Sequence, residues 1–222
     1  MAAFRPRPQD LPTEFPIFPL EGALLLPGGR LPLNIFEPRY LAMTLDSLGA
    51  GRMFAMVQPD PAQPPVPNGP ALYRVGCLGR VSSFSETDDG RLLITLTGLI
   101  RFAIDSELDM VHGYRRVRGD FSRYLADLDE LSKPAAFDRE KLTEALRCYF
   151  QRRQVDANWD AIRRMPTEAL VVTLAMACPF EPVEKQALLE APTPADRGAT
   201  LLALLQMGAA GPPDPPSGHS VS

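Results

Sequence analysis

Proline constrains this sequence more than any other residue type, because it accounts for 24 of the 222 residues. Since proline lacks a backbone N–H and breaks helix interiors, the chain cannot form one long helical bundle or a coiled coil. The prolines cluster at residues 1–19, at 59–70 and after Gly211. We expect disordered tails over 1–13 and 208–222, and a stiff surface loop of polyproline character in the middle cluster.

The first half of the chain has the pattern of a β-rich domain, predicted over residues 14–125. One helix is predicted over 38–48, with a proline at its first position and a glycine after its end. The pair Asp89-Gly90 predicts a hairpin turn between two long strands. Gly98 interrupts the second of these strands, which indicates a bulge or a sharp bend. A further strand is predicted over 114–121.

The second half of the chain has a helical period, and its composition changes near residue 130. Asp138 is predicted to cap the first long helix of this half. Residues 193–196 form a capping box that starts the last helix, which we expect to end at Gly208. Because strands come first and helices second, the sequence predicts an α+β fold with a helical bundle over 126–207.

Charge and cysteine content limit the setting in which the chain works. The net charge of −4 gives no general attraction for nucleic acid or for an anionic membrane. Cys77, Cys148 and Cys178 are far apart and odd in number, which predicts no disulfide framework and indicates a reducing compartment. No signal peptide is visible, and the longest uncharged apolar stretch, 169–180, is shorter than the ~20 residues of a membrane-spanning helix. We therefore expect a cytoplasmic protein.

Four stretches, in this order, resemble the N-terminal, substrate-binding domain of Lon proteases and its standalone relatives. They are FPIFPLEGALLLPGGRLPLNIFEPRY (15–40), LYRVGCLGRV (72–81), DGRLLITLTGLIRF (89–102) and PFEPVEKQALLEAPTPADRGATLLALL (179–205). The resemblance covers about residues 14–207. It implies a small six-stranded, PUA-like pseudo-barrel followed by a C-terminal helical bundle.

The sequence also departs from a complete Lon protease. A phosphate-binding loop places a lysine directly after a glycine, and none of Lys133, Lys141 and Lys185 follows a glycine. No chain remains after the matched region to hold the serine–lysine dyad of Lon proteolysis. The resemblance therefore implies a non-enzymatic module, without a cofactor, that binds exposed hydrophobic segments of proteins or a protein partner.

Other kinds of site have weaker support in the sequence. His112, His219 and the cysteines show no metal-ligand spacing, so no metal is expected. His112 is the candidate for a hydrolytic site, but without a nucleophile motif we expect a surface loop histidine. RNA binding is the alternative function. It would use two groups of arginines, which otherwise form local ion pairs on a solvated face: Arg115, Arg116, Arg118 and Arg123, and Arg152, Arg153, Arg163 and Arg164.

An apolar group around the first helix is the candidate peptide-binding site. It consists of Phe36, Tyr40, Met43, Met53 and Met56, together with Phe54. Methionine is flexible and polarizable, and it suits surfaces that accept varied apolar partners. The competing interpretation is that these residues form the core between a helix and the barrel. The proline loop at 59–70 either borders such a groove or is an inert spacer.

Overall fold

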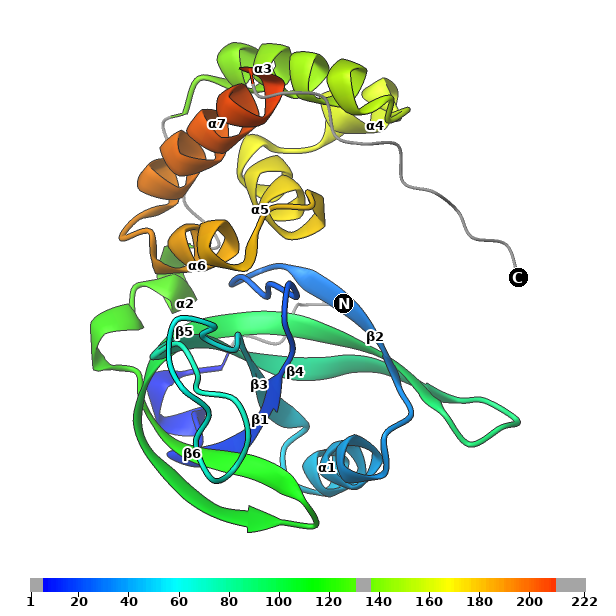
Figure 1. The fold of residues 1–222 in the computed structure, drawn as a ribbon, viewed down its shortest axis with the longest axis vertical. Helices are drawn as coiled ribbons and strands as arrows, with labels where there is room; N and C mark the ends of the chain where they lie inside the picture. The colour runs from blue at the N-terminus through cyan, green and yellow to red at the C-terminus, as the bar shows by residue number, and fades with distance from the viewer. Residues whose placement is uncertain (1–5, 131–136, 211–222) are drawn as a thin grey trace.

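The computed structural model describes residues 6–130 and 137–210. A six-stranded sheet, with α1 beside it, forms one end of the molecule and helices α3 to α7 form the other, so the predicted α+β class is confirmed (Figure 1). The strands are β1 (Glu14–Pro19), β2 (Arg30–Ile35), β3 (Met53–Val57), β4 (Val75–Glu86), β5 (Leu92–Val111) and β6 (Tyr114–Asp120). Their order is β2-β5-β4-β3-β1-β6, and β5 also pairs with β6, which curls the sheet into a pseudo-barrel.

The long strand β5 bends at the predicted glycine. Its register with β4 shifts between the pairs Leu78–Ile100 and Gly79–Gly98, which leaves Leu99 as the extra residue of a bulge. A side chain at Gly98 would place its Cβ 2.0 Å from the carbonyl oxygen of Leu26. Only glycine therefore lets the loop before β2 pass so close to β5.

The helices also begin close to the predicted positions. They are α1 (Pro38–Gly49), α2 (Asp127–Glu130), α3 (Arg139–Arg153), α4 (Trp159–Arg164), α5 (Thr167–Ala177), α6 (Pro182–Glu190) and α7 (Pro194–Ala210), with short 3-10 helices at Pro8–Asp10 and Ser122–Tyr124. Asp138 caps α3 as predicted, accepting hydrogen bonds from the backbone of Glu140 and Lys141.

The predicted end of the last helix is wrong, because α7 continues through Gly208 to Ala210. A Cβ at Gly208 would come within 2.6 Å of the Tyr149 ring. The glycine is therefore a site of close packing between α7 and α3, and does not act as a helix end.

One hydrophobic core joins the sheet to the helices. Its buried residues include Ile35 and Leu96 from the sheet and Leu146 and Leu205 from the helices. A second cluster, around Phe102, fills the closed part of the pseudo-barrel. The two predicted halves of the chain are therefore packed as one body.

Two polar residues of the EKQALLE stretch fasten α6 to the sheet. The Lys185 ammonium donates to the carbonyl oxygen of Gly22 at 2.5 Å, and Gln186 donates to the carbonyl oxygen of Val75 at 3.1 Å. Gln58, directly after β3, donates to the Gln186 side chain at 3.2 Å. Burial lowers the pKa of Lys185.

The proline-rich segments differ in how they are held. In the N-terminal segment, Leu11 packs against the second cluster after the 3-10 helix Pro8–Asp10, which differs from the predicted tail. Residues 1–5 and 211–222 of the predicted tails lie outside the described residues. The loop at 59–70 is mostly exposed, with its first two residues and Asn68 and Gly69 half-buried, and Arg115 holds it by donating to the carbonyl oxygen of Pro70 at 2.7 Å.

Candidate functional site

The residues predicted to bind a peptide are mostly buried. The exposed fraction is 6% for Tyr40, 0% for Met43, 0% for Phe54 and 2% for Met56. Met53 is half-buried, and Phe36 is 62% exposed. Tyr40, Met43, Phe54 and Met56 belong to the core beneath α1, so the group does not line an open groove together. The sequence pattern identified apolar residues near the helix, but not which of them the helix covers.

The structure instead contains an apolar cleft between the sheet and the helices. Its volume is about 1000 Å³. One wall is formed by the loop before β2 and the start of that strand, and the other by α5. Apolar lining comes from Pro27, Leu31, Phe137, Val172 and Met176. We call this site the β2–α5 cleft.

The β2 wall is held in place by backbone hydrogen bonds to β5. Gly28 donates to the carbonyl oxygen of Gly98 at 2.9 Å, and Gly98 donates to that of Gly29 at 2.9 Å. A Cβ at Gly29 would lie 2.3 Å from the sulfur of Met176. The loop therefore approaches α5 as closely as its backbone allows, and the Met176 thioether forms the contact between the two walls.

The α5 wall is held from behind by the first long helix. Arg139 of α3 donates to the Thr167 hydroxyl at 3.1 Å and to the carbonyl oxygen of Ile162 at 2.6 Å. Thr167 is the first residue of α5. Exposed side chains of this wall, including Ala169 and Thr173, face a cleft whose two sides are both fixed by hydrogen bonds.

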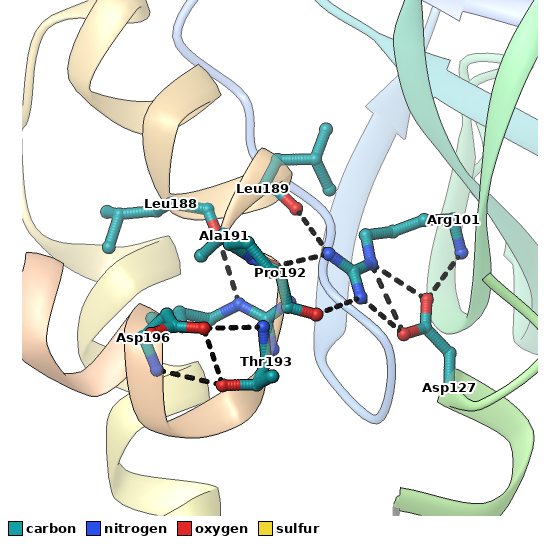
Figure 2. Close-up of polar contacts among 9 residues, drawn as sticks. Arg101, Asp127, Leu188, Leu189, Ala191, Pro192, Thr193 and Asp196 are labelled. Carbon is teal, nitrogen blue, oxygen red and sulfur yellow. Dashed lines mark hydrogen bonds and ion pairs between the residues drawn. The ribbon is translucent and has the colours of Figure 1, made fainter. Parts of the chain in front are cut away.

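A buried ion pair lies beside the cleft, in which Asp127 of α2, a lining residue, meets Arg101 of β5 (Figure 2). The guanidinium donates to both carboxylate oxygens, with Nη2–Oδ1 at 2.7 Å and Nε–Oδ2 at 2.9 Å. Its Nη1 also donates to the carbonyl oxygens of Leu189 and Ala191, at 3.2 and 2.6 Å. The pair therefore joins the sheet to the bend between α6 and α7.

The predicted capping box lies directly after this bend. The Thr193 hydroxyl accepts from the backbone of Asp196 at 3.1 Å, and the Asp196 carboxylate accepts from the backbone of Thr193 at 3.2 Å (Figure 2). It fixes the start of α7, whose Pro194 and Arg197 line the cleft. The sequence identified this element correctly, but not the cleft beside it.

His112 lies in the surface turn between β5 and β6, as expected. Its Nδ1 is 2.8 Å from a carboxylate oxygen of Asp46 on α1, and the Tyr114 hydroxyl donates to the same oxygen at 2.9 Å. The hydrogen bond with His112, followed by that from Tyr114, lowers the pKa of Asp46. Burial, with the hydrogen bond to Asp46, raises the pKa of Tyr114 to about 12. The cluster fastens α1 to the β5–β6 hairpin.

The arginines of β6 form local ion pairs. Arg116 and Arg118 both face Glu14 of β1, at 3.6 and 2.7 Å. Arg115 pairs with Glu107 of β5 and is buried, whereas the sequence indicated a solvated position. This strand therefore places much of its positive charge against acidic side chains.

Two of the three cysteine thiols, Cys77 and Cys178, are buried, and Cys148 is exposed. All three cysteines are free, and burial raises the pKa of Cys178 to about 11. Within residues 6–130 and 137–210, no group of three or more His, Cys, Asp or Glu side chains is arranged to hold a metal ion. The same part of the chain contains no helix long and apolar enough to cross a membrane.

A pseudo-barrel followed by helices is the fold of the N-terminal domains of Lon proteases. The Lon N-terminal domain protein from Xanthomonas campestris matches with a TM-score of 0.60 and 23% identity, covering 86% of this chain and 98% of that chain. The N-terminal domain of the Mycobacterium avium complex Lon protease matches with a TM-score of 0.57 and 16% identity, covering 88% and 97%. At these identities, the likeness shows the fold.

The family follows from the sequence comparison. The profile of the ATP-dependent protease La (LON) substrate-binding domain matches residues 14–207, and the chain belongs to this family. Lon protease 4 of Sorangium cellulosum is 30% identical over 133 residues, which are 60% of this chain and 16% of that protein. The Lon protease of Anaeromyxobacter dehalogenans is 28% identical over 96 residues, which are 43% of this chain and 11% of that protein. The resemblance drawn from the four motifs is confirmed.

Proposed function

We propose that this chain is a non-catalytic recognition module that binds exposed apolar segments of proteins in the β2–α5 cleft. The observation that carries the proposal is the cleft itself, which has a mainly apolar lining, a volume of about 1000 Å³ and two walls that are each fixed by hydrogen bonds. Binding sites are typically preformed hollows of this size with mainly apolar linings. Membership in a family named for substrate binding supports the same function.

The lining indicates what the cleft accepts. On the α5 wall, Met176 contributes a flexible apolar side chain and Val172 a branched one. On the β2 wall, the apolar lining includes Pro27 and Leu31. A flexible thioether lets such a site accept side chains of different shapes. Apolar side chains of an unfolded segment gain stability by leaving water here, at roughly 25 cal/mol per Å² of buried apolar area. The free cysteines favour a reducing, cytoplasmic setting for this binding.

A charge placed in the cleft tests the proposal. Ala169 is an exposed residue of α5 in the lining, and Ala187 is an exposed alanine of α6 that is not part of it. We expect Ala169→Glu to weaken binding of reduced, carboxymethylated α-lactalbumin by about tenfold, the equivalent of about 1.4 kcal/mol. Ala187→Glu, the matched control, should bind like the unaltered protein. Equal binding by both variants, or no binding by the unaltered protein, contradicts the proposal.

A further inference from the structure

The β4–β5 hairpin arm carries an open strand edge at its outer end. We propose that the outer edge of β4, residues Ser82–Glu86, binds an extended polypeptide segment by adding it to the sheet as a further strand. The inference concerns a surface other than the β2–α5 cleft. It rests on the proposed function for the class of partner, a segment of unfolded protein.

The edge opens where β3 ends. β3 pairs with β4 from Met53–Arg80 to Met56–Cys77, and Val81 makes a last hydrogen bond to the carbonyl oxygen of Arg52. Beyond this point β4 pairs with β5 alone among the described residues, and all five residues of Ser82–Glu86 are exposed. The arm projects away from the rest of the molecule, so a partner can approach it (Figure 1).

The hairpin register shows which backbone groups point outward. Thr87 donates to the carbonyl oxygen of Arg91 at 2.9 Å, so this pair is hydrogen-bonded. Hydrogen-bonded and non-hydrogen-bonded pairs alternate along an antiparallel ladder. Ser85–Leu93 is therefore hydrogen-bonded, whereas Glu86–Leu92 and Phe84–Ile94 are not. The N–H and C=O groups of Phe84 and Glu86 consequently point away from β5, toward the open edge.

The opposite edge of the arm is protected by its sequence. By the same alternation, the backbone of Arg30, Pro32 and Asn34 in β2 points outward from β5. Pro32 has no N–H to offer a further strand, and Arg30 places a charge beside it, which are two common ways of blocking an edge. The edge of β4 contains neither proline nor a basic residue. Of these two edges, only that of β4 is open to pairing.

Two side chains indicate the chemistry of the partner. Phe84, which is 44% exposed, and Glu86 are separated by one residue and therefore lie on the same face of the strand. An added strand would meet them with an apolar side chain and, two positions along, a basic one, because such cross-strand pairs are favourable. The segment we infer is extended, uninterrupted by proline, and carries this apolar–basic pair.

A second copy of this chain fits the edge less well. The open edge of Ser82–Glu86 spans only ~17 Å at about 3.3 Å per residue. A stable dimer buries at least about 1,000 Å², and two-fold pairing of so short an edge provides a small fraction of that. A transient linear partner needs only the few backbone hydrogen bonds that this edge offers.

The experiment measures binding of a fluorescent peptide of alternating valine and threonine, with one lysine on the valine face. Its control is the same peptide methylated on alternate backbone nitrogens, which keeps the side chains but blocks one edge. We expect the methylated peptide to bind about tenfold more weakly to the unaltered protein. Equal binding of the two peptides overturns the inference.

Two variants of Glu86 distinguish the contribution of its backbone N–H to peptide binding from the contribution of its carboxylate. Glu86→Pro removes an outward N–H and leaves the pairing with β5 in place, whereas Glu86→Gln keeps that N–H. We expect Glu86→Pro to weaken binding of the peptide about tenfold. Glu86→Gln should weaken it about threefold at low salt, and by less as salt is added. Equal losses for both variants contradict strand addition.

Hydrogen exchange checks the site directly. Saturating peptide should slow exchange at the amides of Phe84 and Glu86, and unchanged exchange at both overturns the inference. Ala169→Glu should leave this peptide's binding unchanged, so a failure at the edge is distinct from a failure of the proposed cleft. If sedimentation shows a dimer that Glu86→Pro dissociates, the occupant is a second copy and the inference is wrong.

Discussion

Gly98 is a residue at which backbone geometry determines the fold. It lets β5 bend under the loop before β2, whose Leu26 carbonyl would lie 2.0 Å from any Cβ at this position. We expect Gly98→Ala to lower the free energy of unfolding by about 3 kcal/mol, because the obstacle is backbone and cannot rotate away. Gly49→Ala is the control, since a Cβ there meets nothing within 4 Å. Denaturant unfolding measures both, and equal stability of the two variants contradicts the argument.

The hydrogen bond between Asp46 and His112 predicts a dependence on pH. Because the pKa of Asp46 is lowered in the folded protein, its stabilising effect is complete above the unfolded pKa of about 3.9 and is lost as the pH falls through the lower folded value. We expect His112→Gly, which suits the positive φ of 47° at this position, to raise the pKa of Asp46 toward its ordinary value. NMR titration of the carboxylate tests this, and an unchanged pKa contradicts it.

Elements are held together by a few buried polar contacts, of which the pair Arg101–Asp127 is central. Asp127→Ala leaves a buried guanidinium without its carboxylate, and we expect a loss of about 3–5 kcal/mol in the free energy of unfolding. Lys141→Ala, which breaks the exposed pair with Asp138, should cause no measurable change. Chemical denaturation of both variants is the measurement. A similar effect of the two substitutions would contradict the central role of the buried pair.

For individual helices and strands, the sequence predicted features that depend on neighbouring residues well and features that depend on distant residues poorly. The Asp138 cap, the turn at Asp89-Gly90 and the capping box at 193–196 each depend on neighbouring residues, and each is found in the structure. Gly208 has the sequence of a helix end, yet it serves the packing of α7 on Tyr149, a residue far away along the chain. Tertiary contacts of this kind leave no local pattern.

The whole molecule positions its candidate sites through one shared core. The β2–α5 cleft joins residues 27–32 to residues 166–177, and no local pattern connects segments so far apart. The family resemblance supplied the pseudo-barrel and the helices, whereas the predicted groove residues Tyr40, Met43 and Met56 belong to that core. The sequence could not show this burial, because apolar residues look alike in sequence whether a helix covers them or not.

The central claim is that unfolded polypeptide binds in the β2–α5 cleft, and a hydrogen-exchange footprint tests it most directly. The unaltered protein is measured with and without saturating reduced, carboxymethylated α-lactalbumin. We predict slower exchange in peptides from residues 27–32 and from α5 (Thr167–Ala177), with no change in α3 (Arg139–Arg153). Bound polypeptide that leaves exchange unchanged in both 27–32 and α5 would contradict the account.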